Sequence, residues 1–99
     1  MIIRRSRRYT VSMGNYESYS FGADVEMSHH DIGLSDEALE KQNDEEFNDT
    51  ANRLTAEILN ELNNQLHDEI EDAAELTSNQ KSYLLKAFAI DKKTIKRRK

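Results

Sequence analysis

Apolar and polar residues alternate along two stretches near the start of the chain. Tyr9, Val11 and Met13 alternate with polar neighbours before Gly14-Asn15. After it, the alternation continues through the apolar residues Tyr19, Phe21, Ala23, Val25 and Met27. A period of two residues is typical of strands with one buried face. The pattern therefore predicts an antiparallel β-hairpin over residues 4–27.

The same pattern constrains the turn. A two-residue loop at Gly14-Asn15 would place apolar residues opposite polar ones, because a one-residue slip turns every side chain to the other face. An odd connection gathers the apolar residues on one face, so we expect a three-residue or bulged turn with a positive φ angle at Gly14 or Asn15. The resulting pairs are Met13 with Glu17, Val11 with Tyr19, Tyr9 with Phe21, Arg7 with Ala23 and Arg5 with Val25.

A second pattern, with a helical period, follows the hairpin. Apolar residues recur at spacings of three and four and predict one long helix over residues 44–75. Glu61 and Gln65 interrupt a strict heptad, which favours a helix lying across the hairpin over a coiled coil. The stripe consists of Phe47, Ala51, Leu54, Ile58, Leu62, Leu66, Ile70 and Ala73.

Two shorter helices flank the long one. Ser35 is a suitable N-cap for a helix over residues 35–42. Thr77 and Gln80 form a capping-box pattern that starts a helix over residues 77–90. The inner face of this last helix is expected to hold Leu84, Ala87 and Phe88, with Tyr83 at its edge.

The predicted fold class is α+β, with the N-terminal hairpin packed on the long amphipathic helix and on the shorter C-terminal helix. Residues 1–91 are expected to form a single small domain, and residues 92–99 a disordered basic tail.

Composition limits the size of the core and the compartment. Of the 99 residues, 36% are hydrophobic and 33% are charged, so the core is thin. Together with two free strand edges, this predicts a homodimer. The chain has no cysteine, no apolar run near the ~18 residues of a membrane span, and no apolar segment behind its first arginines. We therefore expect a cytoplasmic protein without a signal peptide.

The net charge of −5 conceals basic ends and an acidic middle. Residues 31–91 hold 16 acids and 4 bases, whereas residues 92–99 hold six bases. Guanidinium groups pair with phosphates and aromatic rings stack on bases, so the basic ends predict a contact with nucleic acid. The candidate residues are Arg4, Arg5, Arg7, Arg8, Tyr16, Lys92, Lys93, Lys96, Arg97, Arg98 and Lys99.

Two other interpretations stay open. In the first, Tyr9, Tyr19 and Phe21 are core residues and the arginines pair with the acidic helices of the same molecule. In the second, the chain is a protein-interaction module, an inhibitor or adaptor that uses its acidic helices or the hairpin edge.

Catalytic and metal-binding patterns are weak. His29-His30-Asp31, with His67 elsewhere, resembles a metal cluster, but adjacent residues at a strand end point to opposite sides. We therefore expect the start of an exposed loop, no bound metal and no cofactor. The acids of the long helix lack an accompanying nucleophile or glycine-rich phosphate loop, so we do not expect an enzyme.

A resemblance appears at the turn, in the run Met13-Gly14-Asn15-Tyr16-Glu17-Ser18. A strand, a Gly-Asn-aromatic-Glu turn, a second strand and an acidic helix resemble short, mostly uncharacterised proteins encoded by bacteriophages of actinobacteria and other hosts. The resemblance covers the hairpin and the start of the long helix. It implies a phage accessory protein in the cytoplasm of a bacterial host, and it supplies no activity.

Overall fold

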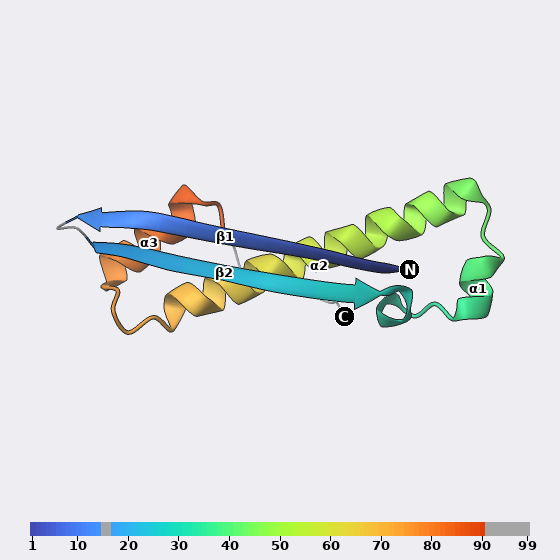
Figure 1. Cartoon of the computed structure of the whole chain (residues 1–99), viewed down its shortest axis with the longest axis horizontal. Helices are drawn as coiled ribbons and strands as arrows, with labels where there is room; N and C mark the ends of the chain where they lie inside the picture. Colours follow the sequence, from blue (N-terminus) through green and yellow to red (C-terminus); the bar gives the residue numbers. More distant parts are fainter. Residues whose placement is uncertain (15–16, 91–99) are drawn as a thin grey trace, which may run out of the picture.

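Two long strands pair into one antiparallel hairpin that lies against the helices (Figure 1). The computed structural model of the chain describes residues 1–14 and 17–90. β1 spans Ile2–Gly14 and β2 spans Glu17–Ser28. The predicted register is confirmed, and it pairs Arg5 with Val25, Arg7 with Ala23, Tyr9 with Phe21 and Val11 with Tyr19.

The turn contains a bulge. Ser12 pairs with Ser18 and Gly14 pairs with Glu17, which leaves Met13 as the extra residue of β1. The expected pair of Met13 with Glu17 is therefore wrong, because the bulge absorbs the odd residue within the strand. Gly14 has the predicted positive φ angle, 84°, which glycine adopts at little cost. Asn15 and Tyr16 lie outside the described residues.

Up to residue 90, four helical segments follow the hairpin. They are the 3₁₀ helix η1 (His29–Ile32), α1 (Asp36–Glu40), α2 (Asp44–Glu71) and α3 (Ser78–Ala87). The expected caps are present: the Ser35 hydroxyl accepts from the Ala38 N–H, and Thr77 and Gln80 form a capping box. A further capping box starts α2, where Asn43 and Glu46 bond to each other's backbone N–H groups.

The long helix is shorter than the sequence predicts, because α2 ends at Glu71 and not at residue 75. Acidic side chains occupy its last turns, where the negative end of the helix dipole disfavours them. The chain then turns so that Ala73 and Leu76 are buried, and the Leu76 N–H donates to the Ala73 carbonyl at 3.3 Å. These two apolar residues direct the chain back towards α3.

The core lies between the hairpin and α2. The predicted stripe of α2 is confirmed for five side chains that have no exposed surface: Leu54, Ile58, Leu62, Leu66 and Ile70. At the start of the helix the prediction is wrong, because Phe47 is 44% exposed. On the other side of the core, β2 contributes Tyr19, Phe21, Ala23 and Val25, all buried. Phe88 lies against Tyr9, with ring centroids 4.5 Å apart. Ala87 is exposed, so its predicted place on the inner face of α3 is wrong.

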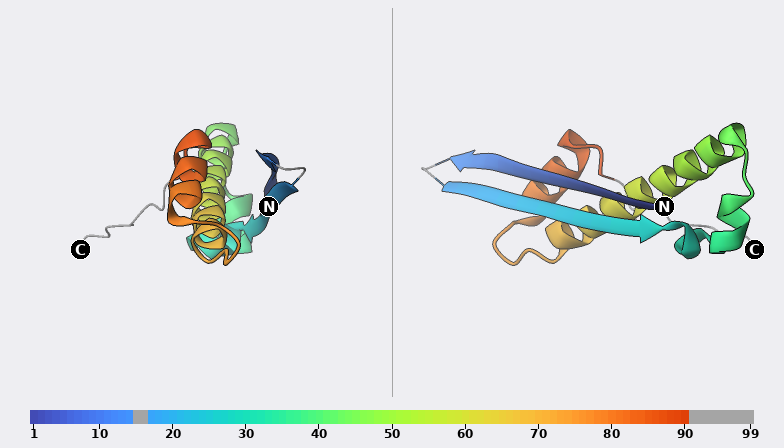
Figure 2. Two further views of the ribbon diagram at one scale, coloured as in Figure 1. Left: turned by 90° about the vertical axis from the view of Figure 1, so that its left-hand side faces the viewer. Right: turned by 45° about the vertical axis from the view of Figure 1, so that its right-hand side comes forward.

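The molecule is long and thin, with extents of 57 × 32 × 19 Å. α2 crosses behind the hairpin; η1 and α1 cap one end, and α3 covers α2 near the hairpin tip (Figure 1). Seen end on, the hairpin lies on one side of α2 and α3 on the other (Figure 2). Among the helices of the described part, none combines the length and the apolar character that a membrane crossing requires.

Candidate binding surface on the hairpin

The four arginines of β1 do not form one basic patch. Arg4 and Arg8 lie on the outer face of the hairpin, with guanidinium nitrogens 3.3 and 3.9 Å from the Asp24 carboxylate. The hydrogen bond from Arg4 to Asp24 raises the pKa of the Arg4 guanidinium. These two arginines are therefore partly neutralised by an acid of the neighbouring strand, and not by the acidic helices.

Arg7 points to the inner face and joins β1 to α2. Its Nη1 donates to Asn63 Oδ1 at 2.6 Å, and its Nε and Nη2 donate to the Tyr9 hydroxyl at 2.9 and 2.6 Å. The guanidinium is half-buried, with its carbon 5.4 Å from the centre of the Tyr9 ring. Arg7 therefore links β1 to α2 through hydrogen bonds of its guanidinium group.

Arg8 lies flat over the hairpin because Gly22 stands opposite it. A Cβ atom at Gly22 would lie 2.8 Å from the Arg8 Cγ and 2.8 Å from the Arg7 carbonyl oxygen. Glycine is thus required here by a close approach and not by its φ angle.

An open hollow of about 330 Å³ adjoins Gly22 and is lined in part by Thr10, Ser20 and Glu69. The two hydroxyl oxygens are 3.1 Å apart, and the Glu69 carboxylate accepts from the Gly22 N–H at 3.4 Å. Within the described residues, this lining contains one carboxylate, that of Glu69, and no histidine.

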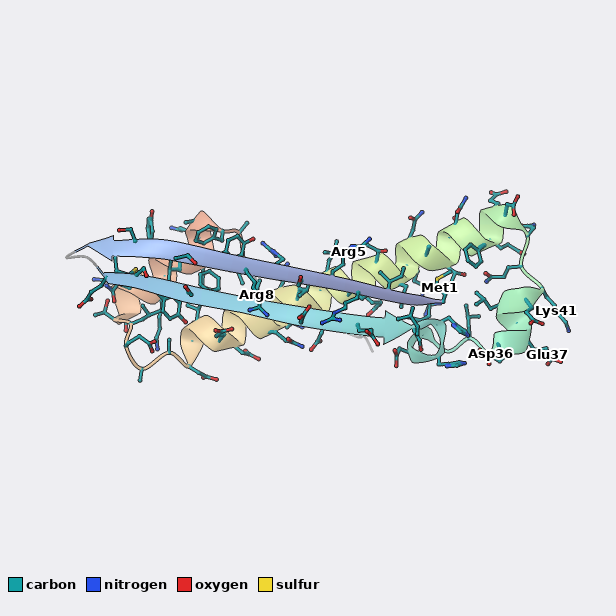
Figure 3. All side chains as sticks on the ribbon, in the orientation of Figure 1. Met1, Arg5, Arg8, Asp36, Glu37 and Lys41 are labelled. Atoms are coloured by element: carbon teal, nitrogen blue, oxygen red, sulfur yellow. The ribbon has the colours of Figure 1, made fainter. Side chains whose placement is uncertain are left out.

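Arg5 is the exposed arginine at the side of the hairpin. Its Nη1 donates to the Arg4 carbonyl at 2.9 Å, and it forms no ion pair with an acid of the described part. Figure 3 shows Arg5 beside β1 and Arg8 over the outer face of the hairpin. The other predicted nucleic-acid residues, Tyr16 and the basic residues from Lys92 to Lys99, lie outside the described residues.

The two edges of the hairpin differ. The Gly22 N–H points away from β1, because it donates to Glu69 of α2. Alternate residues of an antiparallel strand direct their backbone groups to the same side. The outward groups of β1 therefore belong to Arg4, Ser6, Arg8, Thr10 and Ser12. Among the described residues, only the Arg4 carbonyl of this set accepts a further hydrogen bond, from Arg5.

The inner face is also covered unevenly. The inward side chains of β2 are buried, whereas those of β1 are only half-buried: Ile3, Tyr9, Val11 and Met13. Asn63 marks the side of α2 that faces β1, and Leu59, one turn earlier on that side, is 46% exposed. We use the term β1 edge for the outward backbone groups of residues 4–12 together with this half-buried row and Leu59.

The two adjacent histidines also depart from the sequence expectation. They lie in η1 and not on a strand, so their rings do not point to opposite sides. His29 Nε2 lies 2.7 Å and His30 Nε2 2.9 Å from the same Asp36 oxygen. Hydrogen bonds from His29 and then His30 lower the pKa of Asp36. Asp36 was not anticipated as their partner, because its role in the sequence is that of an ordinary first residue of a helix.

No protein-family model, curated protein sequence or solved structure matches this chain. The resemblance to phage-encoded proteins therefore stays a prediction.

Proposed function

We propose that this chain is a non-enzymatic protein-binding module that pairs the β1 edge with an extended segment of a partner protein. The observation that carries the proposal is the asymmetry of the hairpin. The β2 edge is met at Gly22 by Glu69 of α2. On the β1 edge, as far as residues 1–14 and 17–90 show, the outward backbone groups other than the Arg4 carbonyl stay open beside a half-buried apolar row.

A partner strand added to the β1 edge would pair with its outward backbone groups and cover its half-buried apolar row. Its backbone would bond to the outward N–H and C=O groups of residues such as Ser6 and Thr10, as in other cases of strand addition. Every second side chain of the segment would lie on the inner side, next to Val11, Met13 and Leu59. The partner segment therefore carries apolar residues at alternate positions.

Arg5 indicates which charge the partner segment would carry. In the part of the chain that the structure describes, its guanidinium bonds to a backbone carbonyl on the edge that the segment would occupy. A carboxylate on the incoming strand would form a charge-assisted, bidentate pair with Arg5 and release that carbonyl for the new strand. The partner segment thus combines apolar residues with an acidic one near Arg5.

A second copy of this chain is a weaker candidate for the same edge. Antiparallel pairing along the whole of Ile2–Gly14 is centred on Arg8 and places two Arg8 side chains opposite each other. Like charges directly opposite are destabilising in a sheet. The homodimer predicted from the sequence would have to overcome this repulsion or use another surface.

Nucleic acid is disfavoured as the ligand of the described part. Arg7 is engaged by Asn63 and Tyr9, and Arg4 and Arg8 lie against Asp24. Residues 1–14 and 17–90 contain 18 acids and 8 bases, which repel phosphates. We keep the resemblance to phage-encoded proteins as part of the proposed protein-binding function. The partner would then be a host or phage protein in a bacterial cytoplasm.

A peptide selection followed by an edge substitution tests the proposal. Random peptides about as long as β1 are displayed and selected on the intact chain, and we expect enrichment of sequences that alternate apolar residues and include acids. Ser6→Pro removes an outward N–H without removing a bond between β1 and β2, and proline is tolerated at such edge positions. It should abolish binding of the enriched peptides.

Ser6→Ala is the matched control, because it keeps the N–H and should bind normally. On binding, the amide protons of Ser6, Arg8 and Thr10 should become protected from exchange. Binding that survives Ser6→Pro, or amide protection confined to another face, would contradict the proposal. So would tight, salt-dependent binding of a labelled oligonucleotide that is lost when Arg4, Arg5 and Arg8 become alanine.

A further inference from the structure

Three metal-ligand side chains meet where the hairpin joins the helices. His29 and His30 are neighbours in η1, and Asp36 is the first residue of α1. One ligand atom from each of the three lies within 4.8 Å of the other two. Figure 3 shows Met1 and Asp36 at the same end of the molecule.

We propose that His29, His30 and Asp36 bind a divalent transition-metal ion of the Zn²⁺ class. Two imidazoles and one carboxylate suit Zn²⁺, Ni²⁺ or Cu²⁺, whereas Mg²⁺ and Ca²⁺ prefer oxygen ligands alone. The site is independent of the β1 edge, and its test does not depend on the proposed partner.

The spacing of the ligand atoms fits such an ion. Zinc bonds of about 2.0–2.1 Å at tetrahedral angles place ligand atoms roughly 3.3 Å apart. The nitrogens of His29 and His30 lie 2.7 and 2.9 Å from the Asp36 oxygen. An outward movement of a few tenths of an ångström at the exposed His30 and Asp36 would admit the ion.

His29 also has the support that a metal-ligating histidine needs. Its side chain is 7% exposed, and its Nδ1 lies 3.3 Å from the Met1 carbonyl oxygen. Ligating histidines commonly donate their second ring N–H to a backbone carbonyl, which fixes the tautomer. With the proton on Nδ1, the Nε2 lone pair of His29 faces Asp36 and is available to a metal.

The other tautomer gives the competing explanation. The Met1 amino group lies 3.0 Å from His29 Nδ1, and an Nδ1 that accepts from this amine leaves the proton on Nε2. Both histidines would then donate to Asp36, and the cluster would be a hydrogen-bonded tie between η1 and α1. Asp36→Asn separates the two explanations, because the amide oxygen still accepts N–H groups but is a poor zinc ligand.

The experiment is a calorimetric titration of the intact, untagged chain with Zn²⁺, repeated with Co²⁺ to record its visible absorption. We expect one ion per chain and a Tm raised by several degrees, since the ion binds only the folded state. His30→Ala and Asp36→Asn should each weaken binding by about tenfold or more. The control is His67→Ala, which removes a histidine of α2 outside the cluster and should leave Zn²⁺ binding unchanged.

Three results would overturn the site: no uptake by the intact chain, unchanged affinity in both cluster variants, or equal loss in His67→Ala. If a variant does not fold, NMR of the intact chain decides. Addition of Zn²⁺ should shift the Nε2 resonances of His29 and His30 while that of His67 stays in place, and Nε2 resonances that do not move would exclude the site.

Discussion

At the scale of single residues, position on the strand decides what each arginine of β1 does. Residues 5 and 7 share their parity with Tyr9 and Val11, so their side chains start on the inner face, while Arg4 and Arg8 start on the outer face. The alternation in the sequence already contained this division. A cluster of arginines that is contiguous in sequence is therefore not contiguous in space when it lies on a strand.

Arg7→Ala should destabilise the free protein. The substitution removes the hydrogen bonds to Asn63 and Tyr9 and leaves their polar atoms half-buried without that partner, so we expect a loss of about 1–3 kcal/mol. Urea denaturation of the variant measures it. Arg5→Ala is the control and should stay within about 0.5 kcal/mol of the parent. Equal stability of both variants would show that the contacts of Arg7 contribute nothing.

Ala89→Gly should stabilise the protein. Ala89 follows the end of α3 with a φ angle of 52°, where a Cβ atom is unfavourable and glycine is usual. We expect a gain of about 0.5–1 kcal/mol, read from the shift of the denaturation midpoint. The same substitution at Ala56, exposed in the middle of α2, should cost about 1 kcal/mol. A loss of stability in Ala89→Gly would contradict the assignment of strain to this position.

At the scale of elements, the periodicity of the sequence predicted which strands and helices form, whereas packing decided where α2 ends. The hairpin register, the buried stripe of α2 and the caps at Ser35 and Thr77 all follow from local patterns. The end of α2 does not, because the burial of Leu76 depends on how the chain returns to α3. The cluster of His29, His30 and Asp36 could not be predicted from the periodicity either, because it depends on the 3₁₀ turn that starts at His29.

Ile58→Ala tests the stripe of α2. Ile58 has no exposed surface, and truncation of such a side chain leaves a cavity. We therefore expect a loss of about 2–4 kcal/mol. Leu59→Ala, at the neighbouring position that is 46% exposed, is the matched control and should have a much smaller effect in the free protein. Similar midpoints of denaturation for the two variants would mean that α2 does not pack on the hairpin through Ile58.

At the scale of the whole molecule, the basic residues at the two ends of the chain differ most from the sequence prediction. The sequence places the bases of residues 1–8 and 92–99 in one candidate site, but only the first group belongs to the described residues, and its members face different surroundings. The acids of the helices could be counted from the sequence. That Asp24 of β2, and not a helix, partly neutralises Arg4 and Arg8 follows from the pairing of Ser6 with Asp24, which the predicted register already implied.

The charge of Arg8 also leads to a prediction of the oligomeric state. Because full pairing of two β1 strands opposes two Arg8 side chains, we expect the chain alone to be monomeric at micromolar concentration. Light scattering should therefore give the mass of one 11.5 kDa chain. Twice that mass, together with loss of the dimer in Ser6→Pro, would instead make a second copy the occupant of the β1 edge.

The elongated shape has a consequence for how that mass must be determined. The radius of gyration is 17.2 Å, whereas a compact chain of this length has about 13 Å. A compact protein needs on the order of 220 residues to reach the same radius. Retention on a gel-filtration column and slow tumbling in solution would therefore both imitate a dimer. A single chain lying lengthwise against its own long helix can have the hydrodynamic size of two.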